Sequence, residues 1–217
     1  MSEAGRGAHP WVSDGPQFME SIETVHALVA QMQLSAQTDQ ILTVIAEESS
    51  AVVIFWQKNG DGWQALFTTP GKLGRCGVGS AHEGSARTPL GAYPLGFAFG
   101  TSNPGTSLPF RLITARSYWI SNPADSAYNT WQERDASSPL DEHLADYPVQ
   151  YQYAVVIDYN TARIPGAGSG FFLHCTNGHP TAGCVAIPTT FMCTAMQRLH
   201  GGAYIVHVTS AQQLLDY

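Results

Sequence analysis

Two histidines and two cysteines lie close together in the segment FFLHCTNGHPTAGCVAIP, residues 171–188. These residue types suit three kinds of chemistry. Histidine and cysteine are ligands that zinc accepts, two cysteines can form a disulfide, and a thiol beside an imidazole can act as a nucleophile. Each interpretation predicts a different kind of protein.

The zinc interpretation requires that His174, Cys175, His179 and Cys184 converge on one ion. The apolar residues before His174 predict a strand, in which neighbouring side chains point to opposite faces. Because His174 and Cys175 are adjacent, they are expected to point away from each other. We therefore expect no metal site in this segment.

The disulfide interpretation stays open at the level of the sequence. Four cysteines among 217 residues are too few for a small disulfide scaffold. Cys175 or Cys76 could pair with Cys193, although Cys193 lies in an expected helix, where a thiol packs as a small apolar side chain. A bridge at Cys184 would remove the nucleophile that the third interpretation needs.

The catalytic interpretation assigns the nucleophile to Cys184 and the base to His174. A histidine that ends a strand is held by a rigid element, and an imidazole partner lowers the pKa of a thiol. Gly183 has no Cβ, so a substrate carbonyl can approach the backbone closely. Backbone N–H groups around residues 182–184 are the expected donors to an oxyanion.

Periodic apolar residues predict the elements that must position this segment. An amphipathic pattern over residues 18–34 predicts a helix. The turn sequence NGDG (59–62) separates two strand-like runs and predicts a hairpin. Pro188 suits the first position of a helix that runs to about His200. The expected strands are 40–46, 51–58, 63–69, 91–99, 118–121, 151–160 and 203–208.

Composition favours one β-rich globular domain and argues against some classes of function. The chain is 44% hydrophobic and 12% charged, with 21 glycines and 13 prolines. A formal net charge of −7 without a cluster of Lys and Arg argues against nucleic acid as a partner. No apolar run approaches the roughly 18 residues of a membrane span. The first residues lack the apolar core of a secretory signal peptide, so we expect a mature segment or export by another route.

The segment 171–188 resembles the catalytic signature of the L,D-transpeptidases (the YkuD-like family), in which a histidine ending a strand precedes a [Ser/Thr]-x-Gly-Cys nucleophile. The resemblance spans about residues 38–208. Within it, the stretches 126–131, 141–144 and 151–160 are similar to the actinobacterial-type branch of the family. It implies a mostly β fold of the L,D-transpeptidase type, a β-sandwich or barrel with a few peripheral helices including an N-terminal one. Residues 1–37 would form the N-terminal arm and helix, and residues 38–217 the catalytic domain. The other matching stretches are EGSARTPLGAYPL (83–95), which holds a Thr-Pro-x-Gly motif, SAYNTW (126–131), DEHL (141–144) and YQYAVVIDYN (151–160).

The resemblance also implies a reaction. Cys184 would attack the peptidoglycan stem tetrapeptide at the carbonyl that joins the L centre of a diamino acid to the terminal D-alanine. His174 would take the thiol proton, or hold a preformed thiolate as an ion pair, and later protonate the leaving amine. The backbone carbonyl of Cys175 would orient the ring, and no cofactor is implied.

The match departs from the family at one position of the nucleophile segment. Many members have Ser-His-Gly-Cys, whereas this chain has alanine at the second position of Thr181-Ala182-Gly183-Cys184. The contact of that second histidine must then come from the backbone or from His179. Glu83 and Arg87 would grip the stem or form an exposed pair. Tyr128 would line the cleft or, as is more common for an aromatic residue in a β-rich protein, belong to the core. The expected substrate-binding residues are Glu83, Arg87, Thr88, Tyr128, Thr181 and Ala182.

The resemblance leaves the biological role open. A thioacyl enzyme that meets an amine of a neighbouring stem gives transpeptidation, and one that meets water gives L,D-carboxypeptidase activity. The same chemistry would serve a secreted antibacterial effector, whose partner would be a cognate immunity protein. A non-catalytic cell-wall-binding module is the third alternative. In each case the partner is peptidoglycan and the expected location is outside the cytoplasm, in the periplasm, cell wall or medium.

Overall fold

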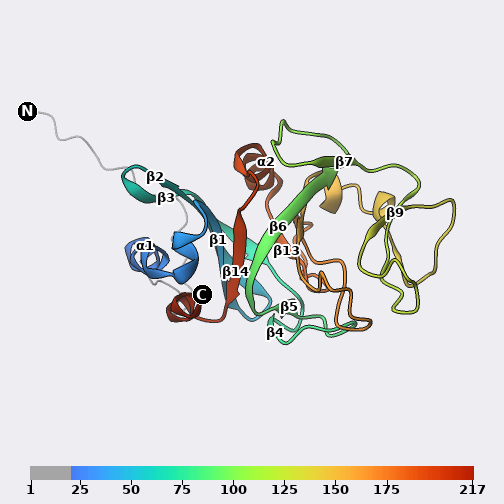
Figure 1. Cartoon of the computed structure of the whole chain (residues 1–217), viewed down its shortest axis with the longest axis horizontal. Helices are drawn as coiled ribbons and strands as arrows, with labels where there is room; N and C mark the ends of the chain where they lie inside the picture. The colour runs from blue at the N-terminus through green and yellow to red at the C-terminus, as the bar shows by residue number, and fades with distance from the viewer. Residues whose placement is uncertain (1–20) are drawn as a thin grey trace, which may run out of the picture.

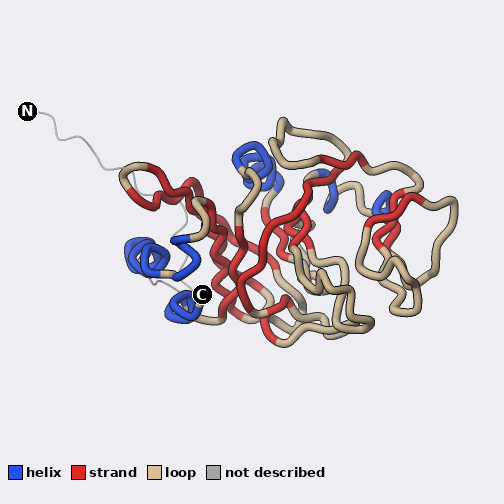
Figure 2. Tube along the Cα trace, viewed as in Figure 1, coloured by secondary structure: helices blue, strands red, loops and turns tan. Residues whose placement is uncertain are grey.

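Strands dominate the part of the chain that the computed structural model describes, residues 21–217 (Figures 1 and 2). Residues 1–20, which include the expected arm and the first residues of the expected helix, lie outside it. In chain order the strands are β1 (Gln40–Glu47), β2 (Ser50–Asn59), β3 (Gly62–Lys72), β4 (Val78–Gly79), β5 (Thr88–Pro89), β6 (Gly91–Gly100), β7 (Phe110–Leu112), β8 (Ser117–Trp119), β9 (Trp131–Glu133), β10 (Glu142–His143), β11 (Ala154–Ile157), β12 (Phe172–Cys175), β13 (Val185–Ile187) and β14 (Tyr204–Val208).

Eight of these strands close into a barrel. The hydrogen-bonded order is β11-β12-β13-β3-β2-β1-β14-β6, and an additional pairing between β11 and β6 joins the two ends. The predicted hairpin is present as β2 and β3, which pair around the NGDG turn. Closure pairs both edges of each strand in the ring, which removes the exposed edges of an open sheet.

Apolar layers fill the barrel and cover part of its outside. The interior core includes Met192, Ala195 and Met196 of α2 (Thr189–Arg198), which follows Pro188. On the outer face of β1, β2 and β14 a second layer packs under α1 (Ile22–Gln31) and the 3-10 helix η4 (Ala211–Asp216). Figure 1 shows α1 and the C-terminus together on that side of the barrel. The short 3-10 helix η1 (Gln33–Ala36) connects α1 to β1.

A small sheet, ordered β10-β8-β9, packs beside another part of the barrel surface. Trp119 of β8 and Trp131 of β9 are buried, and they contact Phe172 of β12 and Phe99 of β6 respectively. The 3-10 helices η2 (Leu144–Asp146) and η3 (Gln150–Gln152) return the chain from this sheet to β11. The small sheet therefore covers the outer face of β12, where the motif lies.

The mostly β class with peripheral helices, including an N-terminal one, is confirmed. The expected strand over 151–160 is shorter than predicted, because β11 contains only Ala154–Ile157 and Tyr151 belongs to η3. An apolar run by itself does not distinguish a strand from a short helical turn at its start. Among residues 21–217, no helix combines the length and hydropathy needed to cross a membrane.

Candidate active site

His174 on β12 and Cys184, the residue just before β13, lie on the same outer face of the barrel. β12 and β13 are parallel, with His174 opposite Ala186. Cys184, just before β13, packs with the outer cluster that includes Tyr151, and the ring of Tyr151 lies edge-on to His174 at 5.4 Å. Cys175 belongs to the interior core instead. His174 and Cys175 thus point to opposite faces, as the alternation of a strand predicts.

His174 is held by its own strand in one orientation. Its Nδ1 lies 2.9 Å from the carbonyl oxygen of Cys175, and the residue is only 6% exposed. Because a carbonyl can only accept, Nδ1 carries the proton and Nε2 keeps its lone pair. Burial lowers the pKa of His174 to about 4, and the bond to the Cys175 carbonyl offsets this in part. The ring is therefore neutral at neutral pH and can accept a proton at Nε2.

Cys184 has a free thiol that is also nearly buried. Its Sγ lies 3.3 Å from the carbonyl oxygen of Gly170 and accepts the N–H of Phe172, also at 3.3 Å. Burial raises the pKa of the thiol far above its usual value, and the carboxylate of Glu142 raises it further. The directions of the two pKa shifts favour a neutral thiol beside a neutral imidazole in the free protein over a preformed thiolate.

The other cysteines do not compete for this sulfur. Cys76, Cys175, Cys184 and Cys193 are all free, so the disulfide interpretation is wrong. Among the hydrogen bonds of residues 21–217, none joins Cys184 to His174 either. The thiol proton points instead toward Gly170, and it must turn before the imidazole can take it. Catalytic hydrogen bonds are often made only in the complex with substrate.

The turn before Cys184 is tightly built around Gly183. A Cβ at this position would lie 2.5 Å from the ring of Phe171 and 2.9 Å from the carbonyl oxygen of Arg87, so only glycine fits. The Gly183 N–H donates to the hydroxyl of Thr181 at 3.0 Å, and that hydroxyl donates to the Cys184 carbonyl at 2.7 Å. Fewer of the backbone N–H groups around residues 182–184 are therefore available to an oxyanion than expected, because the Gly183 N–H already donates to Thr181.

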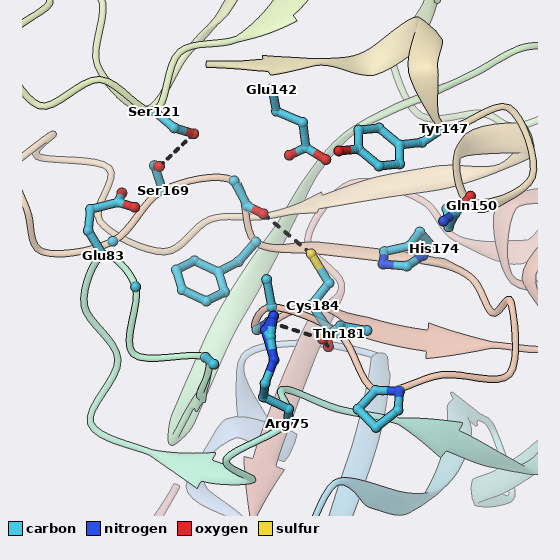
Figure 3. Close-up of a pocket in the computed structure, with 18 of the residues that line it drawn as sticks. Arg75, Glu83, Ser121, Glu142, Tyr147, Gln150, Ser169, His174, Thr181 and Cys184 are labelled. Atoms are coloured by element: carbon cyan, nitrogen blue, oxygen red, sulfur yellow. Dashed lines mark hydrogen bonds between the residues drawn. The ribbon is translucent and has the colours of Figure 1, made fainter. Parts of the chain in front are cut away.

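A cavity of about 600 Å³ opens beside the sulfur. His174, Cys184 and Gly183 line it, and so do Glu83, Thr181 and Ala182 of the expected substrate-binding set. Figure 3 shows Cys184 in the middle of this cavity, with Glu142 on one side and Arg75 on the opposite side. Glu83 and Glu142 approach from different segments, the first from the loop before β5 and the second from β10.

Three expected substrate-binding side chains do not reach the cavity. Thr88 is fully buried, and its hydroxyl accepts the N–H of Gly74 at 2.9 Å. Arg87 turns away and donates to the carbonyl of Cys76 at 2.7 Å, so the suggested pair with Glu83 is not formed. Their backbones shape the site instead, because the loop that carries them abuts Gly183.

Tyr128 supports the cavity wall from behind. It is 2% exposed, its hydroxyl donates to Oε1 of Glu83 at 2.5 Å, and it accepts the N–H of Gly168 at 3.1 Å. Burial, with the neighbouring Glu83 carboxylate, raises the pKa of Tyr128 to about 12. Of the two positions expected for Tyr128, the buried one is therefore observed, and its hydroxyl holds Glu83 in place.

Two residues of the cavity escaped the sequence analysis, namely Glu142 and Tyr151. The hydroxyl of Tyr151 donates to Oε1 of Glu142. A Cβ built on Gly170 would lie 3.6 Å from Oε2 of Glu142, and Gly170 is the residue whose carbonyl contacts the Cys184 thiol. Burial raises the pKa of Glu142 to about 7. The only sequence signal was that both residues lie in the stretches 141–144 and 151–160, for which a resemblance to the L,D-transpeptidases was noted above.

Neither His143 nor His179 forms a hydrogen bond with Cys184. His143 stacks on Tyr118, with its Nδ1 at 2.9 Å from Asp146 and its Nε2 at 2.9 Å from the Ala115 carbonyl. His179 lies exposed on the cavity rim. Within residues 21–217, no group of three or more His, Cys, Asp or Glu side chains is arranged to hold a metal ion.

Comparison with known proteins gives only distant similarities. No family model and no curated protein matches the sequence. Among solved structures, the chain is similar to Bd1075 of Bdellovibrio bacteriovorus, with 14% identity, a TM-score of 0.44, and coverage of 85% of this chain and 56% of that chain. It is similar to the helical cell shape determining protein Pgp2 of Campylobacter jejuni, with 14% identity, a TM-score of 0.43, and coverage of 89% and 60%.

A third similar structure is L,D-transpeptidase 1 of Mycobacterium tuberculosis, with 17% identity, a TM-score of 0.38, and coverage of 78% of this chain and 61% of that chain. The chain spans less than two thirds of the length of these three solved chains. At such low similarity, a function has to be argued from the site itself.

Proposed function

We propose that this protein is a cysteine-dependent peptidoglycan L,D-transpeptidase of the YkuD-like family, actinobacterial-type branch, with accompanying L,D-carboxypeptidase activity. The observation that carries the proposal is the shared placement of Cys184 and His174. Both line one cavity, His174 from β12 and Cys184 from the turn just before the adjacent β13, and His174 has its lone pair on Nε2 because Nδ1 is engaged by the Cys175 carbonyl. A nucleophile, a neutral base and a group that orients the base are the three parts of this type of catalysis.

The neutral pair defines the first half of the reaction. As the sulfur of Cys184 attacks the carbonyl of the diamino acid, the thiol proton passes to Nε2 of His174. The tetrahedral intermediate then collapses, the C–N bond breaks, and the imidazolium returns the proton to the departing amine of D-alanine. We assign the oxyanion contact to the backbone N–H of Cys184, because the Gly183 N–H is engaged by Thr181.

The second half of the reaction transfers the acyl group from sulfur. His174, neutral again, accepts a proton from an incoming amine or water, which attacks the thioester and releases the thiol. An amine from a neighbouring stem gives a crosslink, and water gives the shortened stem. Peptidoglycan as substrate places the protein outside the cytoplasm, and we assign the chemistry to residues 38–217. The effector role with its immunity partner and the non-catalytic wall-binding role stay predictions, since no contact in the structure favours either.

The test uses a disaccharide-tetrapeptide as substrate and mass spectrometry as the readout. The wild-type protein is expected to release D-alanine, to exchange it for an added D-amino acid, or to form a crosslinked dimer. Cys184→Ala should abolish all three reactions. Cys193→Ala is the matched control, because Cys193 is a free, half-buried thiol in α2 and should be dispensable. A wild-type protein that gives none of these products would refute the proposal.

A second test addresses the nucleophile directly. A carbapenem should acylate the protein once, and peptide mapping should place the adduct on Cys184. Equal labelling of all four cysteines would show that Cys184 is not activated and would favour a binding module. The adduct should also be missing from His174→Gln, because the thiol then lacks the base that takes its proton.

A further inference from the structure

Glu142 and Glu83 are the two cavity carboxylates that accept only a tyrosine hydroxyl, and Glu142 is the one that lies next to Gly170, whose carbonyl contacts the sulfur. One of its oxygens accepts the hydroxyl of Tyr151, and the other lies beside Gly170. None of the ion pairs among residues 21–217 includes Glu142. By contrast, the neighbouring Asp141 accepts from two backbone N–H groups, at Ser121 and Asn122, and from the hydroxyl of Ser137.

A half-buried carboxylate without a cation costs free energy, and here it also disfavours the catalytic step. A negative charge close to the thiol opposes the formation of thiolate, and it raises the pKa of Cys184. Arg75 is the one arginine or lysine among the described residues that line the cavity, and it lies on the opposite side of the sulfur (Figure 3). A positive charge that enters the cavity with a ligand would form an ion pair with Glu142. It would also offset the effect of the Glu142 charge on the thiol, so that thiolate forms more easily.

We propose that Glu142 binds the side-chain ammonium group of the diamino acid in the donor stem, and so selects donors that carry a free amine beside the scissile bond. The inference rests on the proposed function, which already places a diamino acid at this bond. Tyr151 is the positioning residue, because its hydroxyl holds one oxygen of the carboxylate and leaves the other toward the cavity. The ammonium would sit between Glu142 and the acyl group on Cys184.

The experiment measures only formation of the acyl enzyme, by intact mass, with no acceptor added. Two donor peptides are compared, one with the free side-chain amine of the diamino acid and one in which this amine is acetylated. For the wild-type protein, acetylation should lower the acylation kcat/KM by roughly tenfold to a hundredfold, the range of a charge-assisted hydrogen bond. In Glu142→Gln the free amine should lose this advantage, so the two peptides should react within about threefold of each other.

Glu83→Gln is the matched control. Glu83 lines the same cavity and is also held by a tyrosine hydroxyl, from Tyr128, but it approaches from another loop. Because Glu83 lines the cavity, its replacement is expected to change the acylation rates of both peptides together, so only the ratio of the two rates is compared, and that ratio should stay at the wild-type value. If Glu142→Gln keeps the preference, the inference is wrong. If neither peptide acylates the wild-type protein, the proposed function itself fails, so the two failures are distinguishable.

The pH dependence of the preference provides a test that needs no variant. The titratable groups that face Glu142 are Tyr151, Tyr147 and Cys184, and the pKa of each is raised, while burial lowers that of His174 to about 4. Glu142, with its pKa of about 7, is then the group that gains a proton between about pH 8 and 6. The ratio of the two kcat/KM values should fall toward one over this range. A ratio that is constant with pH would contradict the inference.

Discussion

Two buried histidines, His174 and His207, are alike in nearly every local property. Each has its Nδ1 against a backbone carbonyl, that of Cys175 at 2.9 Å and that of Pro89 at 2.8 Å. Each imidazole has a tyrosine ring beside it. The distance between ring centroids is 5.4 Å from His174 to Tyr151 and 5.8 Å from His207 to Tyr93. Burial lowers the pKa of both to about 4.

The two histidines differ only in what surrounds Nε2. His207 is 0% exposed, and its Nε2 is the one buried side-chain nitrogen or oxygen without a hydrogen-bond partner among residues 21–217. His174 lines a cavity that also holds a thiol and a carboxyl group. A perturbed pKa is therefore not what identifies the candidate site, because a sealed structural histidine has the same one. Access for a ligand distinguishes them.

The same contrast separates Cys175 from Cys184. Cys175 lies on β12 and faces the barrel interior, whereas Cys184 precedes β13 and faces the cavity. Burial raises the pKa of both thiols. Cys175 contributes its backbone carbonyl to the site and its thiol only to the packing of the core.

The largest expected difference is in turnover. His174→Gln should lower the rate of the proposed reaction by roughly a hundredfold to ten-thousandfold, the usual contribution of a general base. His207→Gln should keep the wild-type rate within about twofold per folded molecule, because His207 reaches no ligand. Rates are measured by D-alanine release, with the folded fraction of each variant taken from circular dichroism. Equal losses in the two variants would break the comparison.

In stability, by contrast, the two histidines should behave alike. The pKa of each is about 4 when folded and about 6.5 in the unfolded chain, so the unfolded state binds more protons between these values. Stability is then lost as the pH falls below about 6.5, by roughly 2 kcal/mol per histidine at about pH 5. Urea unfolding at about pH 7 and pH 5 should show a smaller loss for His207→Gln than for the wild type. An unchanged loss would mean that His207 does not stay neutral.

Cys175→Ala should sharpen the contrast between the cysteines. The variant keeps the carbonyl at position 175 that orients His174, so turnover is expected to stay within about twofold of wild type. It removes a buried sulfur from the interior core, so the free energy of unfolding should fall by about 1–2 kcal/mol. Urea unfolding and D-alanine release measure the two effects. A loss of turnover as complete as that of Cys184→Ala would contradict this division of roles.

The smallest effect concerns the field of Glu142 at the sulfur. Glu142→Gln removes a charge that raises the pKa of Cys184, so iodoacetamide should alkylate Cys184 about two- to fivefold faster at about pH 8. The reagent is neutral and small, so it reports the thiol and not the binding of an ammonium group. The rate is followed by peptide mapping, with Cys76 as the exposed internal reference. An unchanged ratio of the two rates would show that the carboxyl group does not act on the thiol.

Local patterns predicted the elements that depend on neighbouring residues. The NGDG turn predicted the hairpin of β2 and β3, and the proline before α2 predicted that helix. Strand alternation also predicted that His174 and Cys175 point to opposite faces. Glu142 could not be predicted in this way, because β10 has only two residues and carries no periodic signal. Tyr151 was placed in a strand, since the 3-10 turn that turns its ring toward His174 follows from packing on Phe172 and Phe99.

The sequence by itself determined the candidate reacting groups and their local order. A histidine ends a strand, its own chain supplies the carbonyl that orients it, and a glycine with no room for a Cβ precedes the cysteine. Only the tertiary structure decided that Cys175 and Cys184 face different environments and that Glu142 lies beside Cys184. The physical reason is that burial and electrostatic field come from contacts between distant segments, and here the small sheet of β8, β9 and β10 lies against β12.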